Sequence, residues 1–331
     1  MPTSTILSEV SLLRPILAVL IVAGHTFGIY AGGWHEPIGF VPNEAYAWIA
    51  RVCFAATLPS FVFISGYIYG YQTEYLHKKN TLLLLTKKKS IRLLLPSFIF
   101  GLAYLFVFDT GKGNFLVIIW NSINGTAHLW FLPMLFWCFI FEWIISKIRI
   151  PQIIILALLL ILNYTSYRFE SFPFQLSKSF SYLLFFHLGY IVACKIDIFR
   201  LHVKMWNTFI VVFFFFLFFV LFQLNEDLLP YKITKLLYIV QQIWGVFTLY
   251  MLSMIHAQRH VVCNTWHSFG VYSMGVYIFH QFFLIGIYYH SVLPICLGYV
   301  FLPWFSFVIT LALSFLFSWI LKKNHLGRQL I

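Results

Sequence analysis

Two ionisable residues lie in the first apolar segment of the chain, LLRPILAVLIVAGHTFG (12–28). Arg14 and His25 are eleven residues apart, about three helical turns, which predicts one shared helix face and a separation of ~16 Å along the axis. A guanidinium can contact an anion, and an imidazole can accept a proton near neutral pH. Alternatively, the arginine snorkels to the lipid headgroups and the histidine is hydrogen-bonded in the core. This helix alone leaves both interpretations open.

Other ionisable residues interrupt later apolar segments. Arg51, Glu142, His187 and His280 all lie within such segments. An ionisable group at the centre of a bilayer costs at least ~2.5 kcal/mol on insertion scales, so each side chain should face the interior of a helix bundle. Arg51 and Glu142 have opposite charges, but their expected depths differ. We expect His187 to hydrogen-bond within the core.

The composition identifies an integral membrane protein. Of 331 residues, 61% are hydrophobic, 21% aromatic and only 10% charged, a balance outside the range of soluble domains. The apolar segments continue along the whole chain, which predicts one transmembrane domain over 1–331. The first segment lacks a preceding basic region and a small-residue cleavage site, so we expect a retained helix. The five cysteines have no spacing typical of a disulfide framework or metal site: Cys53, Cys138, Cys194, Cys263 and Cys296.

The segment lengths predict an all-α fold, a polytopic bundle of about ten membrane helices. The expected spans are 11–32, 46–72, 90–109, 127–146, 151–167, 178–195, 205–224, 234–256, 269–290 and 299–321. Pro15 suits the first turn of a helix, where its missing N–H costs little, so we expect Arg14 at the helix start.

Lys and Arg residues gather on one side of this predicted bundle. One set of alternate connections contains Lys78, Lys79, Lys87, Lys88, Lys89, Arg92, Lys147, Arg149, Lys195, Arg200, Lys204, Arg259, Lys322, Lys323 and Arg328. The opposite set contains only Lys112, Arg168, Lys178, Lys232 and Lys235. The positive-inside rule therefore predicts that both termini are cytoplasmic. Contact with anionic membrane lipid then accounts for the net charge of +12 without a nucleic-acid partner.

Several segments resemble the acyltransferase-3 family of integral membrane enzymes. The spacing of Arg14 and His25 matches the R-x10-H signature in the first helix of that family. Five further segments resemble family motifs in the same order: FVFISGYIYGY (61–71), KKKSIRLLLPSF (87–98), HLWFLPMLF (128–136), FFHLGYIVA (185–193) and SMGVYIFHQFF (273–283). The resemblance covers the whole chain in register with the ten predicted spans.

The resemblance implies an O-acyltransferase of the bacterial inner (plasma) membrane. Acyl-CoA would be the donor, with acetyl-CoA expected, and the acceptor would be a hydroxyl of an extracytoplasmic glycan such as O-antigen or capsule. His25 would be essential for transfer and Arg14 would support it. The chemistry agrees, because an attacking hydroxyl must lose its proton and a positioned histidine can take it. No metal is expected.

The donor would meet its first candidate contacts on the cytoplasmic side. Lys89 and Arg92 lie where the phosphates of CoA would arrive, and Lys and Arg are typical phosphate ligands. The alternative is that this basic run only sets the topology and contacts anionic lipid. Ser65 and Gly66 either leave room for the pantetheine arm or allow close packing of two helices.

Candidate acceptor contacts are His128, Trp130 and His280. His128 and Trp130 are expected at the outer start of the fourth span, where an interfacial aromatic anchor is the alternative. His280 belongs to the last family-like segment. A different function, a transporter or flippase for a glycan or its lipid-linked precursor, would also use a bundle with buried charges. Against it, the sequence shows no internal repeat and no matching pair of interrupted helices.

Overall fold

The computed structural model describes residues 7–37, 39–78, 80–108, 114–169, 172–260 and 264–330. Lys79, Lys112 and Cys263 lie outside these described residues. Within them the fold is all-helical, which confirms the predicted fold class. The α-helices are α1 (Ser8–Phe27), α2 (Glu44–Phe54), α3 (Thr57–Glu74), α4 (Leu82–Lys89), α5 (Leu95–Phe108), α6 (Phe115–Asn124), α7 (Phe131–Ile145), α8 (Gln152–Thr165), α9 (Leu176–Cys194), α10 (Ile196–His202), α11 (Met205–Asn225), α12 (Tyr231–Arg259), α13 (Asn264–Val271), α14 (Ser273–Tyr289), α15 (Leu293–Lys323) and α16 (His325–Leu330).

Eight helical segments in the described part of the chain are long and apolar enough to cross a membrane. They are Ser8–Ala31, Glu44–Glu74, Leu82–Phe108, Ala127–Ile145, Leu176–Cys194, Met205–Leu228, Tyr231–Arg259 and Leu293–Lys323. The other two predicted spans, 151–167 and 269–290, correspond to shorter elements, α8 with 14 residues and α13 with α14, which has 17 residues. The cytoplasmic position of the termini stays a prediction.

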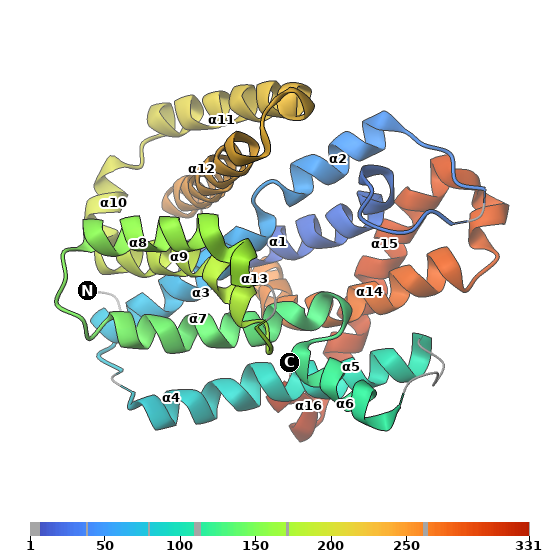
Figure 1. The fold of residues 1–331 in the computed structure, drawn as a ribbon, viewed down its shortest axis with the longest axis horizontal. Helices are drawn as coiled ribbons and strands as arrows, with labels where there is room; N and C mark the ends of the chain where they lie inside the picture. Colours follow the sequence, from blue (N-terminus) through green and yellow to red (C-terminus); the bar gives the residue numbers. More distant parts are fainter. Residues whose placement is uncertain are drawn as a thin grey trace.

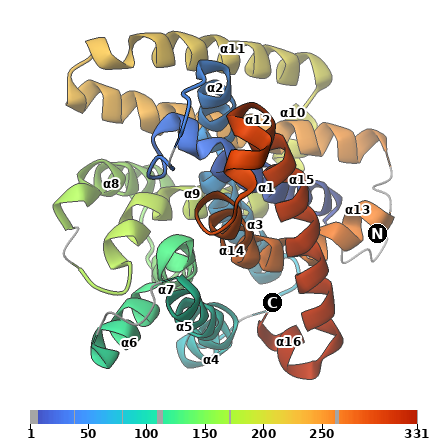
Figure 2. The ribbon, with the colours of Figure 1, turned by 90° about the vertical axis from the view of Figure 1, so that its right-hand side faces the viewer.

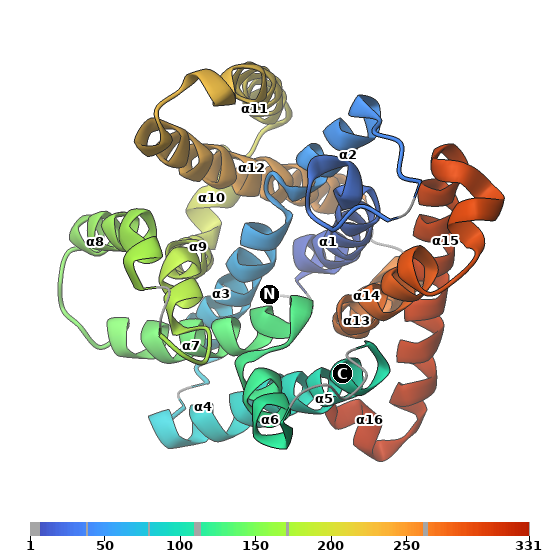
Figure 3. The same ribbon diagram turned by 45° about the vertical axis from the view of Figure 1, so that its right-hand side comes forward.

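Helices α1 and α3 lie in the middle of the bundle (Figure 3). Around them lie α12, the pair α14 and α15, helices α4 to α6, and the group α7 to α9. Leu17, Ala18 and Val22 of α1 and Val62 and Phe63 of α3 are completely buried. The apolar core is therefore centred on the two helices that carry the R-x10-H and serine–glycine segments.

Two glycines let α3 and α9 approach closely. A Cβ atom added at Gly66 would lie 1.9 Å from the carbonyl oxygen of Phe186, and one at Gly189 would lie 2.0 Å from that of Phe63. Each helix thus presents a glycine to the backbone of the other, as in close-packed membrane helices. This contact fixes α3 against the α7 to α9 group.

The first helix begins earlier than the sequence indicated. Helix α1 starts at Ser8, so Pro15 lies inside it and Arg14 lies beyond its first turn. The prediction that Arg14 marks the helix start was therefore wrong. A proline is tolerated in a membrane helix when neighbouring groups compensate for the interrupted ladder. Helix α13 packs here, where Trp266 Nε1 donates to the carbonyl of Leu12 at 3.2 Å.

Segments distant in sequence meet at the α4–α5 edge of the bundle. Helices α11 and α12 form one edge of the molecule, and α4, α5 and α6 lie on the opposite side (Figure 1). The C-terminal helix α16 contacts the π turn η2 (Ser90–Leu94), which joins α4 to α5. Figure 2 shows α15 and α16 running alongside α14 toward that edge. The end of the chain thus approaches the basic run after α3.

Candidate active site

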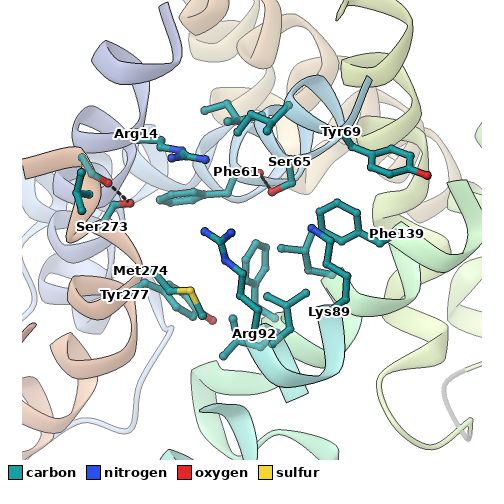
Figure 4. Close-up of a pocket in the computed structure, with 18 of the residues that line it drawn as sticks. Arg14, Phe61, Ser65, Tyr69, Lys89, Arg92, Phe139, Ser273, Met274 and Tyr277 are labelled. Carbon is teal, nitrogen blue, oxygen red and sulfur yellow. Dashed lines mark hydrogen bonds between the residues drawn. The ribbon is translucent and has the colours of Figure 1, made fainter. Parts of the chain in front are cut away.

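A pocket of about 350 Å³ lies between α1, α3, α7, α14 and the π turn η2. Its charged lining residues are Arg14, Lys89, Arg92 and Lys322, which all carry positive charge. No carboxylate lines it among the described residues. We call it the cationic pocket. Figure 4 shows Arg14, Lys89 and Arg92 pointing into one space from different elements.

The π turn η2 directs two of these cations into the pocket. Lys89 is the last residue of α4, and Arg92 lies within η2. A π turn inserts an extra residue into the helical repeat and is frequent at functional sites. Lys89 Nζ lies 3.3 Å from the ring centroid of Phe139 on α7, a cation–π contact. The basic run is therefore divided: these two cations face the pocket, whereas Lys87 and Lys88 do not line it.

Arg14 has no carboxylate partner in the described part of the chain. Glu9, one and a half turns earlier on α1, is held elsewhere. Tyr67 donates its hydroxyl hydrogen to Glu9 Oε1 at 2.5 Å, and Arg200 Nη2 lies 3.8 Å from the same oxygen. The positive charge of Arg14 is thus directed to the pocket. Lys89, Arg92 and Lys322 also form no ion pair with a described carboxylate, although Lys322 Nζ donates to the carbonyl of Val271. Four cations without acidic partners around one space favour a polyanion such as a group of phosphates.

Ser65 and Gly66 have different surroundings. Ser65 lines the cationic pocket, and its hydroxyl donates to the carbonyl of Phe61 at 2.9 Å. Gly66 faces α9, where an added Cβ would meet Phe186. The packing interpretation therefore holds for Gly66, whereas Ser65 borders the space that a ligand would use. A donor contact by either residue stays a prediction.

Three histidines form a second centre, which we call the histidine cluster. It consists of His25 on α1, His128 on the 3-10 helix η3 (Ala127–Trp130) and His280 on α14. His280 Nε2 lies 3.4 Å from His25 Nδ1. The rings of His128 and His280 are 4.9 Å apart, as are those of His25 and His280. His280 therefore lies between the other two.

Backbone carbonyls define the tautomers of the cluster. His25 Nδ1 lies 2.9 Å from the oxygen of Ile21, so the neutral ring carries its hydrogen on Nδ1 and its lone pair on Nε2. His280 Nδ1 donates in the same way to the oxygen of Tyr277 at 2.6 Å. No hydrogen bond within the described chain reaches His25 Nε2. This nitrogen is therefore free to accept a proton.

His128 is buried within the cluster. Its exposed fraction is 5%, and Nε2 lies 2.9 Å from the carbonyl oxygen of Ile278. Nδ1 has no hydrogen-bond partner among the described groups. Trp130 lies apart from the cluster, against Tyr182 and beneath Lys178 Nζ, which is 4.1 Å from its ring. The structure thus joins His128 and His280 to His25 but does not join Trp130 to them.

Tyr277 links the two centres, the cationic pocket and the histidine cluster. Its side chain lines the cationic pocket, and its hydroxyl donates to the carbonyl oxygen of His128. Its ring packs on Phe131 with 5.3 Å between centroids. His25 itself does not line the pocket. Tyr277 is therefore a pocket residue that also contacts the histidine cluster.

The other ionisable residues singled out in the apolar segments, Arg51, Glu142 and His187, are paired within the protein. Arg51 Nη1 lies 2.7 Å from Glu44 Oε1. Glu142 lies 3.0 Å from His187 Nδ1, and both side chains are almost completely buried. The expected core hydrogen bond of His187 is confirmed, and Glu142 pairs with His187 rather than with Arg51. Neither pair lines the cationic pocket.

Sequence reasoning did not select Lys322 or Tyr277 as site residues. Lys322 appeared only as one of the fifteen basic residues on one side of the predicted bundle, and nothing local separates it from Lys323. Tyr277 lies in the family-like segment 273–283, three residues before His280. Its aromatic side chain is unremarkable in a chain that is 21% aromatic. Both residues belong to the site only through tertiary contacts.

Comparison with known proteins identifies a family for this chain. No curated protein and no solved structure matches the chain. A family model described as an acyltransferase domain (Acyl_transf_3) matches residues 7–323, and this range contains both the cationic pocket and the histidine cluster. Because the match covers nearly the whole chain, the protein belongs to the acyltransferase-3 family, which supports a membrane acyltransferase in general.

Proposed function

We propose that the protein transfers an acyl group, with acetyl expected, from acyl-CoA to a hydroxyl of an extracytoplasmic glycan. The observation that carries the proposal is the placement of two complementary centres along one helix. Arg14 of α1 faces a pocket with four cations, and His25 of the same helix has a free imidazole nitrogen. The separation of ~16 Å between them along the helix axis suits a donor with phosphates at one end and a thioester at the other.

The cationic pocket fits the phosphate end of acyl-CoA. Arg14, Lys89, Arg92 and Lys322 would contact the phosphates, since guanidinium and ammonium groups form strong charge-assisted hydrogen bonds to phosphate oxygens. The basic run lies on the side predicted to be cytoplasmic, where acyl-CoA is available. Apolar side chains such as Ile64 and Leu135 also line the pocket. They would contact the pantetheine arm as it extends toward Tyr277.

His25 would act as the general base. Acyl-CoA supplies the activated acyl group as a thioester. His25 Nε2 would take the proton of the acceptor hydroxyl. At the same time the hydroxyl oxygen would form a bond to the acyl carbon, and the carbon–sulfur bond of the thioester would break. The proton then passes from the imidazolium to the departing thiolate, so free CoA and the ester are the products. A positioned base contributes about 10²- to 10⁴-fold to such a step.

The test measures transfer of label from radiolabelled acetyl-CoA to membrane and surface glycan. Cells with wild-type protein are compared with cells carrying His25→Ala or Arg14→Ala at equal membrane levels. We expect label in glycan with wild type and its loss with His25→Ala. Equal labelling in wild type and His25→Ala, with folded protein in both, would refute the role of His25.

A matched histidine variant separates chemistry from folding. His202 is exposed on α10 and lies in neither centre, so His202→Ala should label glycan as wild type does. Movement of unmodified glycan across the membrane by wild type, without any incorporation of label, would favour a transporter instead.

A further inference from the structure

Beyond His25, on the side away from Arg14, lies a second cavity of about 530 Å³, which is open to the outside of the protein. It is lined by Gly32, Gly33, Trp34, His35, Tyr104, Ile285 and Tyr289. We call it the aromatic cavity, and we propose that it binds one sugar residue of the carbohydrate acceptor. The assignment rests on the proposed function, and it adds three aromatic residues, Trp34, Tyr104 and Tyr289, to the predicted acceptor contacts.

The aromatic cavity adjoins a small slot that His25, the proposed base, helps to line. A slot of about 10 Å³ lies beside His25. Trp34 and Tyr289 line both this slot and the aromatic cavity. A space of this size holds about one water molecule, so it also admits one hydroxyl oxygen. A sugar in the cavity would therefore place one hydroxyl beside His25, while the rest of the ring stays outside the slot.

Hydrogen bonds hold the shared aromatic rings in place. Trp34 Nε1 donates to the backbone oxygen of His25 at 3.0 Å, and the two rings lie edge to face with 6.0 Å between centroids. The hydroxyl of Tyr289 donates to the backbone oxygen of His35 at 2.6 Å. The rings are thus fixed before a ligand arrives, which reduces the entropy lost on binding.

The turn before Trp34 keeps the cavity open. Gly32 has a φ of 72°, and no atom lies within 4 Å of the position that its Cβ would occupy. This left-handed conformation favours glycine. The chain therefore reverses here without a side chain that would fill the space.

The lining suits a neutral sugar rather than an anion. None of its residues is Lys, Arg, Asp or Glu. The C–H faces of a sugar can stack on Trp34 and Tyr104, whose rings combine an apolar face with a polar tip. Within the described part of the chain the hydroxyl of Tyr104 makes no hydrogen bond to the protein, so it can bind a sugar hydroxyl. The volume lies within the range of ~300–1,000 Å³ typical of small-ligand pockets.

The experiment measures the acceptor KM and the donor KM separately. Initial rates of label transfer from acetyl-CoA are recorded in membranes while the concentration of the cells' own surface glycan is varied. We expect Tyr104→Ala and Trp34→Ala each to raise the acceptor KM about tenfold, the effect of losing one aromatic contact of ~1.5 kcal/mol, with the donor KM unchanged. Trp34→Phe keeps a ring and should be milder than Trp34→Ala.

Phe106→Ala provides the matched control. Phe106 lies on α5 with Tyr104 but is 67% exposed and does not line the cavity, so its acceptor KM should equal that of wild type. An unchanged acceptor KM in an active Tyr104→Ala protein would overturn the assignment and leave the acyltransferase proposal intact. If wild type transfers no label to glycan, the proposed function fails first and the assignment fails with it.

Discussion

His280 Nε2 faces His25 Nδ1 across 3.4 Å, between α14 and α1. His280 Nδ1 donates a hydrogen bond to the backbone oxygen of Tyr277 at 2.6 Å. In the neutral ring, Nε2 of His280 therefore carries a lone pair. That lone pair points at the hydrogen of His25 Nδ1, which also reaches the oxygen of Ile21. His280 therefore supports the tautomer in which His25 Nε2 can accept a proton, and would stabilise the imidazolium that follows.

Replacement of His280 should lower the rate without weakening binding. In His280→Ala we expect kcat to fall about fivefold, because one hydrogen bond worth ~1 kcal/mol is lost from the imidazolium while Ile21 still accepts another. The donor KM should not change. His280→Asn, whose carbonyl can accept a hydrogen bond, should recover part of the rate. Steady-state kinetics in membranes measures both parameters, and a fall in binding at constant kcat would contradict a positioning role.

Neutralising the pocket cations should weaken donor binding. We expect Arg92→Gln, Lys89→Gln and Lys322→Gln each to raise the KM for acetyl-CoA several-fold, since a charge-assisted contact to phosphate contributes about 1.5–3 kcal/mol before solvent screening. Higher salt should raise the wild-type KM in the same direction. The acceptor KM should remain constant.

Two neighbouring lysines serve as controls for the cationic pocket. Lys88 bonds to Asn80, and Lys323 lies over Trp319; neither lines the pocket. Lys88→Gln and Lys323→Gln should therefore leave the donor KM near its wild-type value. If these variants weaken donor binding as much as Lys89→Gln and Lys322→Gln do, general attraction by the basic surface would explain the effect instead of a defined pocket.

The fold class could be predicted from the sequence. A helix that crosses a bilayer must be long and apolar, and such segments are visible directly in the amino-acid composition. The sequence fails at the details that depend on packing. Pro15 is typical of a helix start, yet α1 extends from Ser8. The π turn at Ser90–Leu94 has no sequence signal of comparable strength, although it directs Arg92 into the pocket. Helix α6, which is too short to span, was not predicted.

For the candidate site, too, the sequence reveals some residues and misses others. Local patterns select Arg14, His25 and the basic run at Lys89 and Arg92, because each belongs to one continuous segment. They do not select Lys322, which meets the other cations only through the packing of α15. The aromatic cavity collects residues from three distant segments, 32–35, 104 and 285–289, so no linear motif could reveal it.

The buried pair of Glu142 and His187 should be important for stability rather than for chemistry. Both side chains are at most 1% exposed, and His187 Nε2 also lies 3.0 Å from Gln152 Oε1. Removing one partner leaves the other buried without compensation, which costs about 3–5 kcal/mol. We expect His187→Ala to lower the unfolding temperature in detergent markedly. Glu142→Leu combined with His187→Leu should be less harmful than His187→Ala, and a larger loss in the double variant would contradict this account.

The neighbours Ser65 and Gly66 should respond to substitution in opposite ways. A Cβ at Gly66 would lie 1.9 Å from Phe186 O, a backbone atom that cannot move without separating α3 from α9. Gly66→Ala should therefore reduce the yield of folded protein in the membrane. Ser65 borders the cationic pocket, so Ser65→Ala should fold normally and change only the donor KM.

Gly286→Ala is the control for Gly66, because it also lies inside a helix but no atom lies within 4 Å of its added Cβ. Size-exclusion chromatography in detergent compares the three variants at equal expression. A monodisperse, fully active Gly66→Ala protein would mean that α3 and α9 can separate without loss, and the close contact would then not explain the glycine. Aggregation confined to Gly66→Ala would assign the glycine to packing and leave Ser65 as the residue that a donor in the pocket would meet.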